Sequence, residues 1–96
     1  MNPQIIYNSL YNGKRLVSAQ PIGVCSRQID LVLNNDTIEE IRITGGCHGN
    51  SQGLTALLRG MKVDDAIARL DGIDCNGKGT SCPDQVARLL KMISRH

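Results

Sequence analysis

Aromatic side chains are almost missing from this chain. Its 96 residues include no Trp and no Phe, and the only aromatic residues are Tyr7 and Tyr11. A hydrophobic core must therefore be built from Ile, Leu, Val and Met. A chain this short buries only about two-thirds of its unfolded surface, so we expect one domain over residues 1–96, with a less regular segment at 1–20 and its core at 21–95. A bound metal would help to stabilise so small a domain.

Concentrated charge and long apolar runs are missing as well. The eleven Lys and Arg are scattered among nine Asp and Glu, and the net charge is +2. No basic block is interleaved with aromatic residues, as single-stranded nucleic acid favours, so we expect no nucleic-acid binding. There is no apolar run of about 18 residues and no charged-then-apolar leader. We therefore expect no membrane association and a cytoplasmic protein.

Two hairpins are predicted in the first half of the chain. Asn12-Gly13 is a two-residue turn sequence in which both residues tolerate positive φ. It would join strands near residues 5–11 and 14–18. Further along, apolar and polar residues alternate over 27–34, which is the period of a half-buried strand. A turn then leads to a second strand at 37–44.

The strand at 37–44 needs an irregularity to bury its apolar side chains. Ile38 is out of phase with Ile41 and Ile43 for a regular strand, because successive side chains point to opposite faces. A β-bulge adds one residue on one strand and restores the phase. A bulge near residues 39–40 would turn all three isoleucines toward the core.

Three helices are predicted in the second half of the chain, from apolar residues at helical spacing. Ser51 is expected to cap the first helix, the second covers residues 63–70, and the third has Cys82 as its N-cap and Pro83 at its first position. Their predicted buried faces are Leu54, Leu57, Leu58 and Met61; Ala66, Ile67 and Leu70; and Val86, Leu89, Leu90 and Ile93. Strands followed by helices predict an α+β fold, in which about three helices pack on one face of a small antiparallel sheet.

The four cysteines all lie at the ends of predicted elements rather than on their packed faces. Cys25 precedes the strand at 27–34, and Cys47 lies in a Gly-rich turn before the first helix. Cys75 and Cys82 bracket a Gly-rich loop before the last helix. None forms a Cys-x-x-Cys pair, which excludes zinc-ribbon and thioredoxin spacings. Thiols stay reduced in the cytoplasm, so we interpret the cysteines as ligands or reactive groups rather than as two disulfides.

The placement of these cysteines favours a shared metal site. Cys47 and Cys82 precede helix N-termini, where unpaired amides and the helix dipole favour the thiolate form. Four converging thiolates would suit tetrahedral zinc, and three would leave a position for water, a carboxylate or His48. The alternative is that the cysteines are four small buried hydrophobic residues. A disulfide is less favoured than either.

Other polar residues near the cysteines are weaker candidates for functional roles. His48 is adjacent to Cys47, so their side chains rarely face each other and a Cys–His dyad is not expected, although His48 could cover or complete the site. Asp84 is expected to act in the first turn of the last helix. Residues 72–78 imitate a phosphate-binding P-loop, but Gly79 stands where Ser or Thr must hold magnesium. A Walker fold is therefore excluded, while nucleotide binding by the Gly-rich loops stays open.

The sequence Thr-Ser-Cys-Pro-Asp at residues 80–84 is the signature of the TSCPD-domain family. The chain resembles that family from about residue 21 to residue 93, including the blocks around Cys25 and Cys47. Related domains occur at the C-terminus of adenosylcobalamin-dependent ribonucleotide reductases and as short free-standing proteins. The resemblance implies metal binding by the cysteines. His48, Ser81 and Asp84 are candidates for a second tier of residues around them. It also implies a link to ribonucleoside-diphosphate reductase activity and DNA synthesis, but 96 residues cannot supply the reductase's barrel.

The order of elements and cysteines also resembles the iron–sulfur cluster scaffold proteins, which place three cysteines at points corresponding to Cys25, Cys47 and Cys82. Those scaffolds carry Asp two residues after the first cysteine, where this chain has Arg27. They often carry His before the last cysteine, where it has Ser81. These groups help a scaffold hold and release a labile cluster. The resemblance therefore implies a similar fold more than cluster transfer.

Three functions are compatible with these residues. The favoured function is a metal-binding accessory domain in which Cys25, Cys47 and Cys82 bind zinc. Cys75 is the favoured fourth ligand. Such a domain would serve a protein partner, such as a ribonucleotide reductase. The second is a scaffold for an iron–sulfur cluster or for carried sulfur. The third is a thiol redox subunit in which Cys75 and Cys82 exchange between dithiol and disulfide. No residue is assigned a catalytic role.

Overall fold

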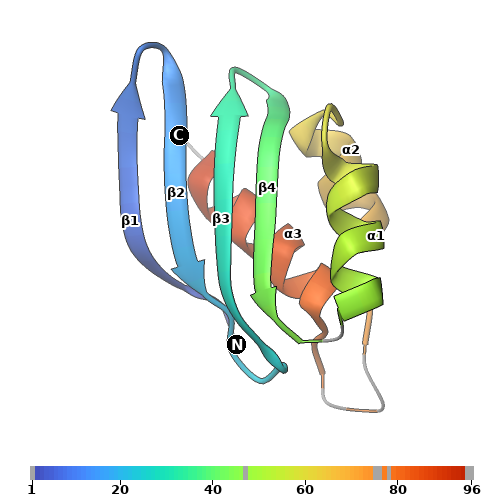
Figure 1. The fold of residues 1–96 in the computed structure, drawn as a ribbon. Helices are drawn as coiled ribbons and strands as arrows, with labels where there is room; N and C mark the ends of the chain where they lie inside the picture. Colours follow the sequence, from blue (N-terminus) through green and yellow to red (C-terminus); the bar gives the residue numbers. More distant parts are fainter. Residues whose placement is uncertain (1, 47, 75–76, 78, 95–96) are drawn as a thin grey trace.

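The computed structural model describes residues 2–46, 48–74, 77 and 79–94, with the side chains of all but 48–50. The elements are β1 (Gln4–Tyr11), β2 (Lys14–Gln20), β3 (Ser26–Asn34), β4 (Thr37–Gly45), α1 (His48–Leu58), α2 (Val63–Leu70) and α3 (Cys82–Ser94). The strands form one antiparallel sheet in the order β1-β2-β3-β4 (Figure 1). The predicted α+β fold is confirmed.

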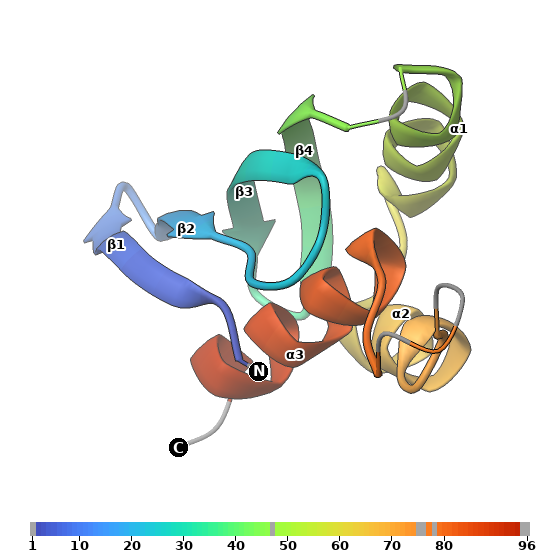
Figure 2. The ribbon, with the colours of Figure 1, turned by 90° about the horizontal axis from the view of Figure 1, so that it is seen from below.

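α3 lies across one face of the sheet, α2 packs against α3, and α1 lies beside the β4 edge (Figure 2). The core cluster between the layers is entirely aliphatic, as the composition requires. It consists of Val17, Ala19, Ile29, Leu31, Leu33, Ile38, Ile41, Leu58, Val63, Ala66, Val86, Leu89, Leu90 and Ile93. Within the part of the chain that the structure describes, no helix is both long enough and apolar enough to cross a bilayer.

Both predicted hairpins and the predicted bulge are confirmed. Asn12 and Gly13 adopt φ of 50° and 76° at the turn between β1 and β2, as a two-residue hairpin requires. In the second hairpin, Leu33 pairs with Ile38 and Val32 with Glu40. Glu39 is therefore the extra residue of a bulge, and this shift turns Ile38 toward the core together with Ile41.

The first helix differs from its prediction in two respects. It begins at His48, so Ser51 is not its N-cap; the Ser51 hydroxyl lies 3.5 Å from the carbonyl oxygen of Gly45. Leu57, predicted to be buried, is 73% exposed, whereas Leu58 is 1% exposed. Because α1 lies at the edge of the sheet, only a narrow stripe of the helix has neighbours to pack against.

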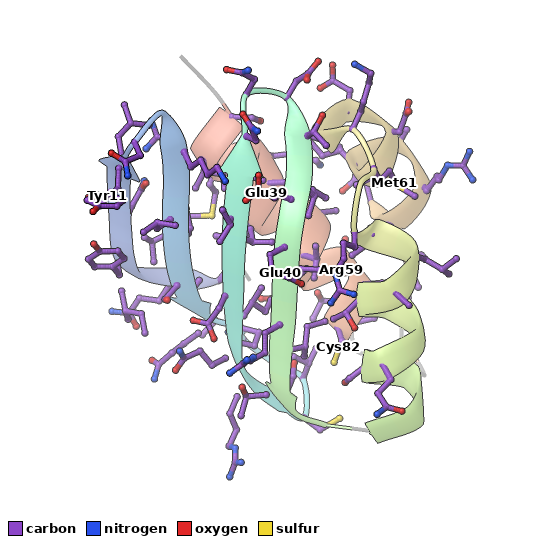
Figure 3. The ribbon with its side chains drawn as sticks, turned by 45° about the horizontal axis from the view of Figure 1, so that its top comes forward. Tyr11, Glu39, Glu40, Arg59, Met61 and Cys82 are labelled. Carbon is purple, nitrogen blue, oxygen red and sulfur yellow. The ribbon has the colours of Figure 1, made fainter. Side chains whose placement is uncertain are left out.

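The two outer strands of the sheet have different surroundings. The edge of β4 is covered: the amide of Ile38 donates to the Met61 carbonyl at 2.8 Å, and the amide of Gly60 donates to the Ile38 carbonyl at 2.7 Å. Arg59 also pairs with Glu40 at 2.7 Å (Figure 3). On the other side of the sheet, β1 pairs with β2 and with no further strand of the described residues. The sheet therefore has one closed edge and one open edge.

Candidate metal centre

Two of the four cysteines fall within the described residues, and both are free thiols. Cys25 is exposed in the turn before β3, and Cys82 is partly buried as the first residue of α3. The predictions made for Cys47, for Cys75 and for the His48 side chain fall outside what the structure describes. The candidate site comprises Cys25, Cys82 and the segments that lead to the other two cysteines.

The start of β3 lies against the start of α3. The hydroxyl of Ser26, a residue only 4% exposed, is 3.2 Å from the Cys82 sulfur, and either group can be the donor. Cys25 immediately precedes Ser26. Two cysteines that are far apart in the sequence are thus brought to the same end of the molecule.

The end of β4 reaches the same place. A Cβ added to Gly46 would lie 3.3 Å from the backbone nitrogen of Ser26, and one added to Gly45 would lie 3.2 Å from the Arg27 side chain. Both glycines also have positive φ, at 83° for Gly45 and 75° for Gly46, which side chains other than glycine tolerate poorly. The glycines let β4 end against the start of β3, two residues before Cys47.

The cap of α3 corrects the sequence prediction by one residue. Ser81, not Cys82, is the N-cap: its hydroxyl accepts from the amide of Asp84 at 3.1 Å, and its carbonyl accepts the first helical bond from the amide of Gln85 at 2.8 Å. A hydroxyl is a better acceptor for these amides than a thiol. Cys82 therefore occupies the first helical position, Pro83 occupies the second, and the Cys82 sulfur has no capping role.

Asp84 does more than the first-turn role expected of it. Its side chain is 1% exposed and accepts from the Thr80 hydroxyl at 2.6 Å, the Gly72 amide at 2.7 Å and the Arg88 guanidinium at 2.7 Å. Burial by itself raises the pKa of Asp84, but the hydrogen bonds from Thr80, Gly72 and Arg88 outweigh it, so the pKa is lowered from its ordinary value. The ionised carboxylate joins α3 to the end of α2 and to the segment that precedes Cys82.

Gln85 is a residue of this region that the sequence interpretation missed. It is fully buried, its amide group donates to the Thr80 hydroxyl at 2.9 Å, and its carbonyl oxygen accepts from the backbone amide of Ile22 at 2.8 Å. It therefore ties the turn that carries Cys25 to the helix that begins at Cys82. The available signal was weak, because a Gln beside an apolar helical stripe is usually read as solvated.

Asp74 organises the Gly-rich loop between Cys75 and Cys82, and it was also missed. Its carboxylate accepts from the backbone amides of Gly77 and Gly79. The adjacent Ile73 carbonyl accepts from the Ser81 hydroxyl at 2.6 Å. The segment that leads into Cys75 is thereby attached to the N-cap of α3, and two of the loop amides that could have faced a phosphate already serve Asp74.

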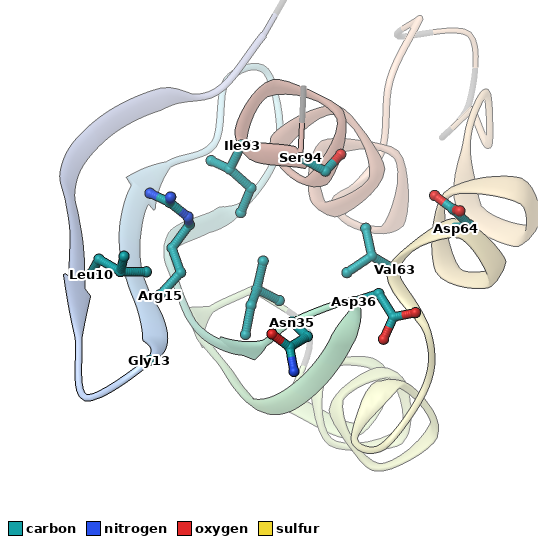
Figure 4. A pocket seen from close by; sticks show the side chains of 10 residues that line it. Leu10, Gly13, Arg15, Asn35, Asp36, Val63, Asp64, Ile93 and Ser94 are labelled. Carbon is teal, nitrogen blue, oxygen red and sulfur yellow. The ribbon is translucent and has the colours of Figure 1, made fainter. Parts of the chain in front are cut away.

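The pocket shown in Figure 4 is not part of this site. It has a volume of about 440 Å³ and lies at the end of the sheet that carries the two hairpin turns. Leu10, Arg15 and Asp36 are among its lining residues, and no cysteine is. Among the described residues, no three His, Cys, Asp or Glu side chains are grouped so that they could hold a metal. Two of the predicted thiolates are outside that set, so the zinc site stays a prediction.

The fold and the site define a small α+β domain in which the segment of Cys25 meets Cys82, where one end of the sheet touches the N-terminus of α3. The chain matches the TSCPD domain over residues 9–94, which is nearly its whole length, and it belongs to the TSCPD-domain family. The match begins within β1, so it includes most of the first hairpin as well as the region around the cysteines. No curated protein and no solved structure matches the chain.

Proposed function

We propose that this chain is a metal-binding accessory domain that holds one zinc ion where β3, β4 and α3 meet. The observation that carries the proposal is the contact of 3.2 Å between the Ser26 hydroxyl and the Cys82 sulfur, because it brings the segment of Cys25 to Cys82. Both thiols are free and neither is fully buried, so each is accessible to an incoming ion.

Chain connectivity supports Cys47 and Cys75 as the remaining ligands. Cys47 follows Gly46, whose backbone lies against Ser26. Cys75 follows Asp74, whose neighbour Ile73 is bonded to Ser81. Consecutive Cα atoms are about 3.8 Å apart, so both thiols belong to segments attached near the start of α3. Four thiolates would make a closed structural zinc site, and three would leave one position open.

The residues around Cys82 suit a bound cation. The Ser26 hydroxyl can donate to the Cys82 sulfur once that sulfur is a thiolate, and such hydrogen bonds orient metal ligands and adjust their charge. Asp84 and Gln85 hold the start of α3 against its neighbours through their hydrogen bonds, so in the folded protein these contacts support the segments that would bind the ion. A bound zinc ion would supply a cross-link between segments far apart in the sequence.

The accessory role rests on the family. The resemblance to domains found at the C-terminus of adenosylcobalamin-dependent ribonucleotide reductases supports the proposal that the domain serves such a reductase, or another protein partner, in deoxyribonucleotide synthesis. We therefore assign binding and positioning to this domain and assign the radical chemistry to its partner.

Elemental analysis of the purified protein tests the zinc site. We expect about one zinc per chain and its loss in at least three of the variants Cys25→Ser, Cys47→Ser, Cys75→Ser and Cys82→Ser. The control is Ser94→Ala, which alters a side chain at the far end of α3 and should retain the metal. Folded protein that contains no metal and four reduced thiols would overturn the proposal. A brown protein with iron and sulfide after anaerobic reconstitution would support the scaffold alternative instead.

A further inference from the structure

The exposed apolar residues of the molecule are concentrated on β1. Four of the eight large hydrophobic side chains that the structure exposes lie on this strand: Ile6, Tyr7, Leu10 and Tyr11. The other four are divided among separate parts of the chain. Tyr7 and Tyr11 are also the only aromatic residues of the protein, and they are 52% and 65% exposed. Tyrosine is enriched in protein interfaces and among the residues that dominate their energy.

The edge of β1 lacks the features that keep such strands from pairing. Soluble proteins protect edge strands with charged side chains, proline, bulges or short length. Here the strand has eight residues, QIIYNSLY, with no charged residue and no proline. The pairing of β1 with β2 shifts register between Ile5 and Tyr7. From Tyr7 to Tyr11 the pairing register is continuous. The segment 7–11 is therefore a regular and unprotected edge.

We propose that β1 pairs antiparallel with β1 of a second copy, joining two four-stranded sheets into one sheet of eight strands. Pairing about a two-fold axis places the same strand on both sides of the interface, so the strand must be complementary to itself. A charged residue near the axis would face its own like charge. Because β1 is uncharged, it meets this requirement, whereas β4 has charged residues and a covered edge.

The backbone of β1 determines which residues can pair. Tyr11 faces Lys14 across the two-residue turn, so the backbone N–H and C=O of Tyr11 point toward β2. These groups alternate in direction along an antiparallel strand. Ser9 and Tyr7 therefore also bond to β2, while Asn8 and Leu10 present their N–H and C=O groups to the open edge.

One pairing register of the two β1 strands allows the backbone hydrogen bonds at the open edge and also brings the tyrosine side chains together. With the two-fold axis at Ser9, Asn8 faces Leu10 of the partner subunit, and the two residues exchange both backbone hydrogen bonds. Tyr7 then faces Tyr11 of the partner subunit at a position without hydrogen bonds, where Cα atoms are about 4.5 Å apart and side chains are closest. The symmetry repeats each pair. The two tyrosines lie on the face away from the helices, because they pair with Ser18 and Lys14 rather than with the buried Val17.

Substitutions that place a charge at the two-fold axis test this interface. We expect the full-length protein to be a dimer by sedimentation velocity. Ser9→Lys and Ser9→Asp should each raise the dissociation constant about fivefold, since like charges directly opposite each other are destabilising. Mixing the two variants should restore a dimer containing one chain of each. The control is Thr44→Lys, a charge added at an exposed position of β4, which should leave the dimer unchanged.

Tyrosine cross-linking provides a second measurement that needs no substitution. Photo-oxidation should join Tyr7 of one chain to Tyr11 of the other, which peptide mass spectrometry would identify. Within one chain the two side chains are four strand residues apart, about 13 Å, too far for a direct bond. A protein that stays monomeric at high micromolar concentration would overturn the proposal. So would a dimer that persists in both Ser9 variants and gives no cross-link between Tyr7 and Tyr11.

Discussion

The cysteine end of the molecule and the β1 edge depart from the usual distribution of residues in opposite ways. Every buried polar residue that the structure describes is at the cysteine end: Ser26, Thr80, Ser81, Asp84 and Gln85. Half of the exposed large hydrophobic residues are on β1 instead. Polar groups are costly to bury and apolar groups are costly to expose. At the cysteine end, hydrogen bonds offset this cost for the described side chains, whereas the apolar side chains of β1 stay exposed.

The two regions differ in whether their polar groups already have hydrogen-bond partners within the chain. At the cysteine end, the described side chains leave no buried nitrogen or oxygen atom without a hydrogen bond, and this is the region in which we propose that a small ion binds. At the β1 edge, backbone groups and tyrosines are left for another chain to cover. The first region is complete in its hydrogen bonds, and the second is incomplete until a strand is added. The five predictions below test this comparison, from the largest expected effect to the smallest.

Removal of metal should affect the cysteine end most. A structural zinc contributes about 10–16 kcal/mol at neutral pH, which exceeds the stability of about 5–10 kcal/mol expected for so small a domain. We expect a strong chelator to unfold the protein cooperatively, as measured by far-UV circular dichroism. The same chelator preloaded with zinc is the control. An unchanged spectrum and melting temperature in metal-free protein would contradict a structural zinc.

Asp84→Asn should destabilise the domain by about 1–3 kcal/mol, because the amide cannot replace the carboxylate as acceptor for Thr80, Gly72 and Arg88 together. Urea unfolding monitored by circular dichroism measures the change. Asp65→Asn is the matched control, because Asp65 is an exposed residue in the first turn of α2. Its effect should stay below about 1 kcal/mol. Equal effects of the two variants would show that the hydrogen bonds of Asp84 contribute no more to stability than an exposed carboxylate does.

The same aspartate predicts a pH dependence. Its pKa is lower in the folded protein than its ordinary value, so its contribution to stability is fully present above the unfolded pKa of about 3.9. That contribution is lost as the pH falls through the lower folded pKa. The free energy of unfolding should therefore fall more steeply below about pH 4 in the natural protein than in Asp84→Asn. Parallel curves for the two proteins would contradict this assignment.

Ser26→Ala should lower the affinity for zinc about tenfold, because it removes the hydroxyl beside the Cys82 sulfur. Competition with a chromogenic chelator measures this affinity. Ser18→Ala is the control: its hydroxyl donates to Asp30 at 2.6 Å, away from the cysteines. Both variants should lose about 0.5–1.5 kcal/mol of stability, but Ser18→Ala should bind zinc normally. Equal zinc affinities would place Ser26 outside the metal centre.

Tyr11→Thr should have the smallest effect on the fold. The side chain is 65% exposed, so we expect the free energy of unfolding of the monomer to change by less than about 0.5 kcal/mol. The dimer should weaken measurably, because the variant lacks both aromatic pairs across the axis. Urea unfolding at low protein concentration and sedimentation velocity at high concentration separate the two effects. A large loss of monomer stability would show that Tyr11 supports the fold itself.

The spacing of neighbouring residues was sufficient to predict most of the strands, turns and helices. The turn at Asn12-Gly13, the bulge at Glu39 and the boundaries of α2 were predicted because each depends on residues close together in the chain. Leu57 was assigned wrongly because its exposure depends on the position of α1 at the sheet edge. The N-cap of α3 was misplaced by one residue because Pro83 was assigned to the first helical position, whereas the hydrogen bonds of Ser81 show that Pro83 occupies the second.

The candidate site was less accessible to sequence reasoning than the elements were. Cys25 and Cys82 could be selected as candidates because of their positions at element ends and their match to a known signature. Asp74 and Gln85 could not be selected, since their roles consist of hydrogen bonds to Gly77 and Gly79 and to the backbone of Ile22. A polar residue in a loop or beside an apolar stripe has no local feature that separates such a role from plain solvation.

By itself the sequence determined the order and type of the elements, the aliphatic composition of the core and the family to which the chain belongs. Each of these follows from periodicity, turn chemistry or a contiguous motif, which are properties of neighbouring residues. Only the tertiary structure decided that Ser26 lies against Cys82, that Asp84 and Gln85 are buried, and that one edge of the sheet is covered while the other is open. Those features depend on how distant segments pack, because burial and exposure are decided by neighbours in space rather than in the chain.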